Sequence, residues 1–276
     1  MIQSDRYVAF LLSTLPKLAA RRLYPPWWPL PMRRFAVLGA ALREMSRRPG
    51  LALEFGVYQG ASLRFSARKY PDRIFYGFDS FCGFPPDERP DWQLDFATDR
   101  LPAVLANCRL IPGWFRDTIP EFLRQRDDTI AFVNIDCDIY GSTREVLFGL
   151  GDRLRPGTVL YFDELINYDT FLWNEMRALF EFLEATGFDV AWIATHSQVR
   201  QLEEVFAYFD AGHYPPWRDD VALGYHRPAA GVLVSGTGEL AMLSSSPERE
   251  RLTALAARFD AWTERYHALR PSAPSL

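Results

Sequence analysis

Short apolar runs alternate with helical segments from residue 51 onward, and this alternation constrains the fold more than any other feature. Runs typical of buried strands lie at 51–55, 74–78, 108–111, 130–135, 158–162 and 188–194. Apolar residues at helical spacing fill the intervals, which predicts helices at 61–69, near 98–106, and at 118–125, 142–153 and 171–186. Strands that alternate with helices build parallel β-α-β units with helices on both faces of the sheet. With a further apolar run at 231–235, we predict an α/β fold with a mostly parallel, seven-stranded sheet.

The segments on either side do not continue the alternation. A short amphipathic helix with Ser4 or Asp5 as its N-cap precedes the connector YPPWWPLPMRR, in which proline and tryptophan argue against regular structure. Helical periodicity follows at 35–47, an irregular insert spans 196–228, and an amphipathic helix lies at about 247–269. We therefore predict three regions: an N-terminal helical arm or lid (1–50), the main domain (51–245), and a C-terminal helix with its tail (246–276).

Composition excludes several classes of protein. With 48% hydrophobic residues, 24% charged residues and a net charge of -4, the chain is typical of globular proteins and has no basic stripe for nucleic acid. Cys82, Cys108 and Cys137 lack zinc-ligand spacing and indicate a reducing compartment. The apolar run near the N-terminus contains Pro16, is too short to span a bilayer, and lacks the leading basic residues of a signal peptide. We expect a cytoplasmic protein without a membrane or nucleic-acid partner; homo-oligomerisation stays open.

The first predicted strand runs into a glycine turn, LEFGVYQGAS. Gly56 permits a tight turn and a close backbone approach to a ligand, and Gly60 opens the next helix. The dinucleotide fingerprint GxGxxG is absent. Asp79 ends the second strand, about 20 residues after the turn, where an acid can bind a ribose diol. Each signal is weak alone, but together they favour an adenosine-containing ligand without a pyrophosphate, such as S-adenosylmethionine.

Two of the predicted core strands each end in a pair of acids. Asp136 and Asp138 follow the fourth strand, and Asp163 and Glu164 follow the fifth. Burying a carboxylate without a partner costs several kcal/mol or makes it neutral, so acids at these positions need a reason. A hard cation such as Mg²⁺ prefers carboxylate oxygens and suits such a group. Helix capping, or ion pairs with Arg144, Arg153 or Arg177, is the alternative explanation.

Four motifs carry a resemblance to a known family: LEFGVYQGASL, YGFDSFCGFP, IDCDIYGST and LRPGTVLYFDE. Over residues 51–194 the chain resembles the macrocin O-methyltransferase family (TylF/MycF type) of class I methyltransferases. The resemblance implies a Rossmann-like fold, S-adenosylmethionine as the methyl donor, and a hydroxyl acceptor on a small-molecule natural product (sugar, polyketide or phenol). It also implies a divalent cation, usually Mg²⁺, with Asp136, Asp163 and Glu164 as its ligands. Such a cation would acidify a coordinated hydroxyl, which is otherwise a poor nucleophile.

The predicted site residues follow from these motifs. The cofactor-binding residues are Glu54, Gly56, Tyr58, Gly60, Ser62, Asp79, Ser80, Trp114, Phe115 and Asp136. The catalytic residues are Asp136, Asp138 and His196. Trp114 and Phe115 could enclose an adenine or belong to the core. Asp138 could orient Asp136, take a substrate proton or cap the next helix, and His196 could act as a general base or be an ordinary hydrogen-bonded residue.

Two other functions stay open at this point. The Asp136-Cys137-Asp138 element also resembles the D-x-D of metal-dependent glycosyltransferases, but that function would give Gly56, Gly60 and the second acid pair no role. A non-catalytic α/β binding module is the other alternative.

The insert at 196–228 carries an unusual number of aromatic residues for a loop: Phe206, Tyr208, Phe209, Tyr214 and Trp217. Long loops inside compact domains are usually functional or disordered, and disordered segments are poor in aromatic residues. We therefore expect the insert to fold over the carboxyl ends of the strands and to select the acceptor.

Overall fold

A computed structural model describes residues 4–23, 30–85, 96–168, 170–195, 199–213, 227–236 and 246–269. Its strands are β1 (Leu51–Phe55), β2 (Phe75–Asp79), β3 (Cys108–Pro112), β4 (Ile130–Ile135), β5 (Val159–Ile166), β6 (Phe188–Thr195) and β7 (Arg227–Ser235). They form one seven-stranded sheet in the order β3-β2-β1-β4-β5-β7-β6. β7 runs antiparallel to both of its neighbours, and the other pairs are parallel. The predicted α/β fold with a mostly parallel sheet is confirmed.

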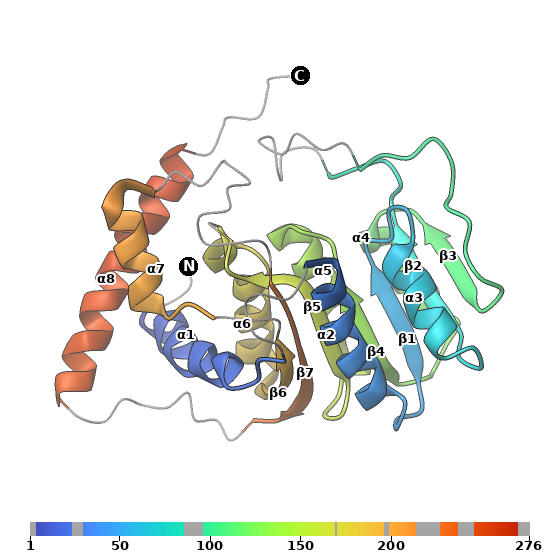
Figure 1. The fold of residues 1–276 in the computed structure, drawn as a ribbon, viewed down its shortest axis with the longest axis horizontal. Coiled ribbons are helices and arrows are strands. Elements are labelled where there is room, and N and C mark those ends of the chain that lie inside the picture. The colour runs from blue at the N-terminus through green and yellow to red at the C-terminus, as the bar shows by residue number, and fades with distance from the viewer. Residues whose placement is uncertain are drawn as a thin grey trace.

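The longer helices are α1 (Ser4–Ala19), α2 (Leu30–Met45), α3 (Ala61–Lys69), α4 (Phe115–Arg124), α5 (Tyr140–Leu150), α6 (Glu175–Thr186), α7 (Leu202–Tyr208) and α8 (Ser246–Leu269). Short 3₁₀ turns follow α5 at Gly151–Arg153 and precede α6 at Phe171–Trp173, and a π turn at Phe209–His213 follows α7. Figure 1 shows helices on both faces of the sheet and a group of three, α1, α7 and α8, at its β6 side. Of the helices described, none is long and apolar enough to cross a bilayer.

The core has two layers because the strands are buried on both faces. Leu53 and Phe55 of β1 pack with apolar residues of α1, α4, α5 and α6, whereas Ala52 packs with those of α2 and α3. Every residue of β4 and β5 is buried. Near-continuous apolar strands of this kind are typical of parallel sheets covered by helices. The strand order reverses between β1 and β4, which is where ligands bind in open α/β sheets.

Two predicted elements differ from the structure within the main sheet. No helix forms at 98–106, because Pro102 lacks an amide donor and disfavours a helical conformation of Leu101. β5 does not stop at residue 162 but continues to Ile166, which pairs with Arg227 after a register irregularity. Asp163 and Glu164 therefore lie within the strand rather than after it.

Two further differences concern the flanking segments. The last part of the connector, predicted to be irregular, is helical, since α2 begins at Leu30; Pro31 sits in its first turn, where no backbone donor is needed. The insert, predicted to lack periodicity, contains α7, whose N-cap Gln201 forms a capping box with Glu204.

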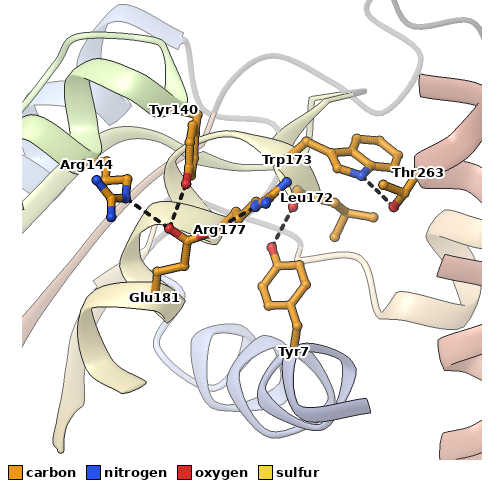
Figure 2. Close-up of polar contacts among 8 residues, drawn as sticks. All are labelled: Tyr7, Tyr140, Arg144, Leu172, Trp173, Arg177, Glu181 and Thr263. Carbon is orange, nitrogen blue, oxygen red and sulfur yellow. Dashed lines mark hydrogen bonds and ion pairs between the residues drawn. The ribbon is translucent and has the colours of Figure 1, made fainter. Parts of the chain in front are cut away.

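The loop before α6 is held between helices from the two ends of the chain (Figure 2). Tyr7 of α1 donates its hydroxyl hydrogen to the carbonyl of Leu172 at 2.6 Å. Trp173 donates its indole N–H to Thr263 of α8 at 2.9 Å, and its ring stacks on Tyr266 with centroids 4.6 Å apart. The terminal helices therefore fix a loop that leads from the acids of β5 into α6.

We predict that Tyr7→Phe lowers the free energy of unfolding by about 1–3 kcal/mol, because the buried Leu172 carbonyl loses its donor. Urea denaturation measures this loss. Tyr70→Phe is the matched control: the Tyr70 ring is only partly buried, and its change should stay within about 0.5 kcal/mol. Equal effects of the two substitutions would show that the Tyr7 hydrogen bond does not stabilise the loop.

Candidate functional site

A cavity of about 390 Å³ lies at the carboxyl ends of β1, β2, β4 and β5. Its volume is within the range of small-ligand sites. Most of the predicted site residues line it: Gly56, Tyr58, Ser62, Asp79, Ser80, Trp114, Phe115, Asp136, Asp138, Asp163 and Glu164. The structure thus brings the predicted cofactor residues and the four acids to one cavity. Glu54 and Gly60 are not among its lining residues, and His196 lies outside the described residues.

Gly56 joins the turn after β1 to the end of β4. Its φ is +90°, and a Cβ at this position would lie 1.7 Å from the carbonyl oxygen of Asp136. The Gly56 amide donates to Phe78, and the Asp136 amide donates to Phe55. The sequence predicted that the backbone at Gly56 lies close to a ligand. In the structure, a side chain is excluded here because the Gly56 backbone lies against the backbone of Asp136.

Asp79 holds the same turn through its carboxylate. One oxygen accepts the amides of Val57 and Tyr58, both at 2.7 Å, and the other accepts the amide of Phe81 at 2.7 Å. A carboxylate has about four acceptor positions. As arranged, Asp79 has room for one further hydrogen bond rather than the two of a ribose diol. Its predicted contact with the cofactor stays a prediction, and its contribution to the turn is evident.

Glu54 of β1 connects α3 to β4 through two buried hydrogen bonds. It is 2% exposed and accepts hydrogen bonds from Ser62 Oγ and Asn134 Nδ2, both at 2.8 Å. Ser62 lines the cavity, so Glu54 acts on the site through it. Gly60, with φ +75°, is the N-cap of α3.

Four residues other than glycine have positive φ in the described chain, and each lies just beyond a strand of the site. They are Tyr58 (+47°), Phe81 (+55°), Asp138 (+63°) and Asn167 (+69°). Such conformations cost about 1–3 kcal/mol each and concentrate at functional sites. Asp138 is not the N-cap residue of α5, which is Ile139.

The three arginines that could have paired with the acids at the strand ends form ion pairs with other carboxylates, and Asp163 accepts a hydrogen bond from a tyrosine. Tyr161 donates its hydroxyl hydrogen to Asp163 at 2.6 Å. Arg144 and Arg177 both pair with Glu181. Figure 2 shows this carboxylate, which also accepts the Tyr140 hydroxyl. Burial and the Glu181 carboxylate raise the pKa of Tyr140 to about 12, so it keeps its proton. Arg153 pairs with Asp127.

Glu175, the first residue of α6, is a buried acid that was not predicted from the sequence. It is 0% exposed, and neither carboxyl oxygen has a hydrogen-bond partner among the residues that the structure describes. Burial raises the pKa of Glu175 well above its usual range, and the charges of four of the acids that line the cavity (Glu164, Asp138, Asp163 and Asp136) raise it further. A signal was available: Glu175 shares the apolar helix face of Ala178, Leu179 and Phe182, at spacings of three, four and seven residues.

The chemistry of these donors fits a hard divalent cation, which takes carboxylate oxygens and water. The buried Glu175 carboxyl, with no partner in the described chain, points the same way. As the side chains lie, no three His, Cys, Asp or Glu residues of the described ranges converge closely enough to hold an ion. The predicted ligands Asp136, Asp163 and Glu164 therefore share a cavity, and their role in binding a cation stays a prediction.

Aromatic residues wall the cavity near the turn after β1. Tyr58 and Phe84 each pack edge-on against Phe96, with ring centroids 5.3 Å apart. Phe84 and Phe96 were not among the site residues predicted from the sequence. Phe115 is 9% exposed and packs on Phe55, so it belongs to the core as well as to the lining.

The aromatic residues that the structure describes in the insert do not line the cavity. Phe206 and Phe209 are 0% and 1% exposed, in the same core cluster as Trp173 and Trp262. These two rings join α7 to the core, and the role of the insert in selecting the acceptor stays a prediction. Tyr214 and Trp217 lie outside the described residues.

Comparison with known proteins agrees with this geometry. A family described as a methyltransferase domain matches residues 53–165. Over its described part the structure resembles the crystal structure of a calicheamicin methyltransferase, CalS11, with a TM-score of 0.51 and 22% identity over 81% of this chain and 91% of the other. The fold is that of Rossmann-like methyltransferases.

Two curated relatives match the central part of the chain. Mycinamicin III 3''-O-methyltransferase of Micromonospora griseorubida is 33% identical over 42% of this chain and 55% of its own length. An O-methyltransferase of Streptomyces olivaceus, which acts at the 4' position of a rhamnosyl-tetracenomycin, is 30% identical over 42% of this chain and 53% of its own length. The chain thus matches about half the length of these relatives.

We predict that Gly56→Ala destabilises the protein by about 2–5 kcal/mol. The left-handed backbone costs about 1–2 kcal/mol for a residue with a side chain, and forcing an atom against Asp136 adds about 1–3 kcal/mol. Gly187→Ala is the matched control, since Gly187 has φ +69° with no atom within 4 Å and should cost only the backbone term. Urea denaturation distinguishes the two, and equal losses would contradict the close contact.

Proposed function

We propose that the chain is an S-adenosylmethionine-dependent O-methyltransferase of the macrocin O-methyltransferase type, acting on a hydroxyl of a small-molecule natural product such as a sugar, polyketide or phenol. The observation that carries this proposal is the shared cavity, which is lined by the glycine turn, by Asp79 and by the acids that follow β4 or lie in β5. The match of residues 53–165 to a methyltransferase domain supports it, because that segment contains all of these residues.

In this proposal the chain positions two reactants rather than forming covalent bonds with them. The turn at Gly56 and Asp79 holds the methyl donor, and the aromatic wall of Tyr58, Phe84 and Phe96 excludes water from it. Methyl transfer from a sulfonium is an in-line displacement, so holding the acceptor oxygen behind the methyl carbon supplies much of the rate.

The acceptor hydroxyl must lose its proton as it attacks. A bound divalent cation would supply a Lewis acid that lowers the pKa of the hydroxyl, with Asp136, Asp163 and Glu164 as the residues that would hold it. Asp138 lines the same cavity in a strained conformation and is our candidate to accept the proton. His196 is the second candidate.

The alternatives are less well supported. A glycosyltransferase would use the Asp136–Asp138 pair, but it gives no role to the glycine turn or to the acids of β5, and the domain match is to methyltransferases. A non-catalytic binding module gives no reason for several acids to share a cavity.

We predict that Asp79→Ala weakens binding of S-adenosylhomocysteine by about 1.5–3 kcal/mol, the cost of losing hydrogen bonds to a charged group. The loss has two sources, a direct contact with the cofactor and the three backbone amides that Asp79 fixes. Isothermal calorimetry measures the change, with Asp117→Asn, on the outer part of α4, as the control. Unchanged affinity in Asp79→Ala would remove this residue from the site.

We predict that EDTA abolishes methyl transfer and that Mg²⁺ restores it. Asp163→Asn should lose activity while it stays folded, because the asparagine oxygen can still accept the Tyr161 hydroxyl. Methyl transfer from labelled S-adenosylmethionine to a panel of glycosides and phenols is the assay, and circular dichroism checks the fold. Full activity after chelation would show that the acids act without a cation and that Asp138 or His196 takes the proton.

A further inference from the structure

Glu175 occupies a position from which it cannot reach solvent. It follows a 3₁₀ turn whose residues are almost fully buried (Phe171, Leu172 and Trp173). Tyr7 and Thr263 fix that turn from α1 and α8, as Figure 2 shows. The turn before Glu175 is thus fixed by α1 and α8, and Glu175 itself begins α6 in the interior.

The ordinary explanations for an acid at this position do not apply. Acids in the first turn of a helix are stabilised by free backbone amides, but neither Glu175 oxygen accepts a hydrogen bond in the described chain. The nearest cation along the helix, Arg177, pairs with Glu181 at 3.2 Å and lies over the Tyr140 ring, 5.1 Å from its centroid. A buried carboxyl without a partner is destabilising by several kcal/mol.

A carboxylate at Glu175 calls for a positive partner, because burial leaves both of its oxygens without a hydrogen bond in the described chain and the charged groups that act on it are acids. Asp136, Asp138, Asp163 and Glu164 all interact with it electrostatically, and all four line the cavity. A monovalent group such as an ammonium would offset one charge, whereas a divalent cation offsets two and accepts several oxygen ligands at once. The accumulation of carboxyl groups therefore favours a divalent cation.

We propose that Glu175 belongs to the cation site and contributes a carboxylate oxygen to a divalent cation that is shared with Asp136, Asp163 and Glu164. This inference rests on the cation of the proposed function and adds a residue to it. It also gives α1 and α8 a role in that site, because they fix the turn that precedes Glu175.

The test measures cation binding without any turnover. Mn²⁺ is titrated calorimetrically into the wild-type protein and into Glu175→Gln, and S-adenosylhomocysteine is titrated separately. We expect at least about tenfold weaker Mn²⁺ binding in Glu175→Gln, the size of effect seen when groups around a metal are removed, with the affinity for S-adenosylhomocysteine changed less than twofold. Glu184→Gln is the matched control: it lies on the same helix, pairs with Arg6 at 2.6 Å, and should bind Mn²⁺ as the wild type does.

A second variant covers a failure of Glu175→Gln to fold. Glu175→Met replaces the buried acid by an apolar side chain of similar length, so the cation-free protein should melt at or above the wild-type temperature, and the stabilisation by Mn²⁺ should disappear. The inference would be overturned if either variant bound Mn²⁺ with the affinity of the wild type, or if Mn²⁺ raised its melting temperature as much as it raises that of the wild type. A wild-type protein that binds S-adenosylhomocysteine but no Mn²⁺ would overturn it too and leave the methyl-donor site standing. A wild-type protein that binds Mn²⁺ but does not bind S-adenosylhomocysteine would contradict the proposed function and leave the inference about Glu175 standing.

Discussion

The contact between Gly56 and the backbone of Asp136 is the constraint on which the site depends. It lies where the strand order reverses, between β1 and β4, and it allows the turn after β1 to rest directly on the end of its neighbour. The glycine turn and the acids of β4 reach one cavity because no side chain separates them. The Asp79 carboxylate then fixes the same turn through the amides of Val57 and Tyr58, and it fixes the turn after β2 through the amide of Phe81.

The site concentrates features that are individually destabilising. Strained backbone at Tyr58, Phe81, Asp138 and Asn167 surrounds it, and Glu175 is buried within electrostatic range of four other acids. Such costs persist only where the surrounding structure over-determines the conformation. Here the sheet is buried on both faces, and the turn before α6 is held by hydrogen bonds from Tyr7 and to Thr263.

The terminal helices α1 and α8 lie far from the site in sequence, but they contact the turn that connects β5 to α6. The methyltransferase-domain match ends at residue 165, before the turn and before Glu175. α1 and α8 lie outside that match and contact each other at the β6 side of the sheet. Their contacts with Leu172 and Trp173 connect these additions to the acid-bearing strand β5. Both Glu175 and the helices that fix the turn before it therefore lie outside the matched segment.

The sequence alone determined the parts of this protein that depend on local patterns. Most strands and helices lie where apolar periodicity predicted them, and the glycine turn and the acids at strand ends were evident from residue type and spacing. Tertiary structure decided the rest. The continuation of β5 depends on pairing with Arg227, and the three amides on Asp79 depend on how the turns lie in space. The buried position of Glu175 depends on helices from both ends of the chain. These contacts join residues that are distant in sequence, so local periodicity cannot predict them. The free energy that selects them comes from packing and from charges that are brought together only in the folded chain.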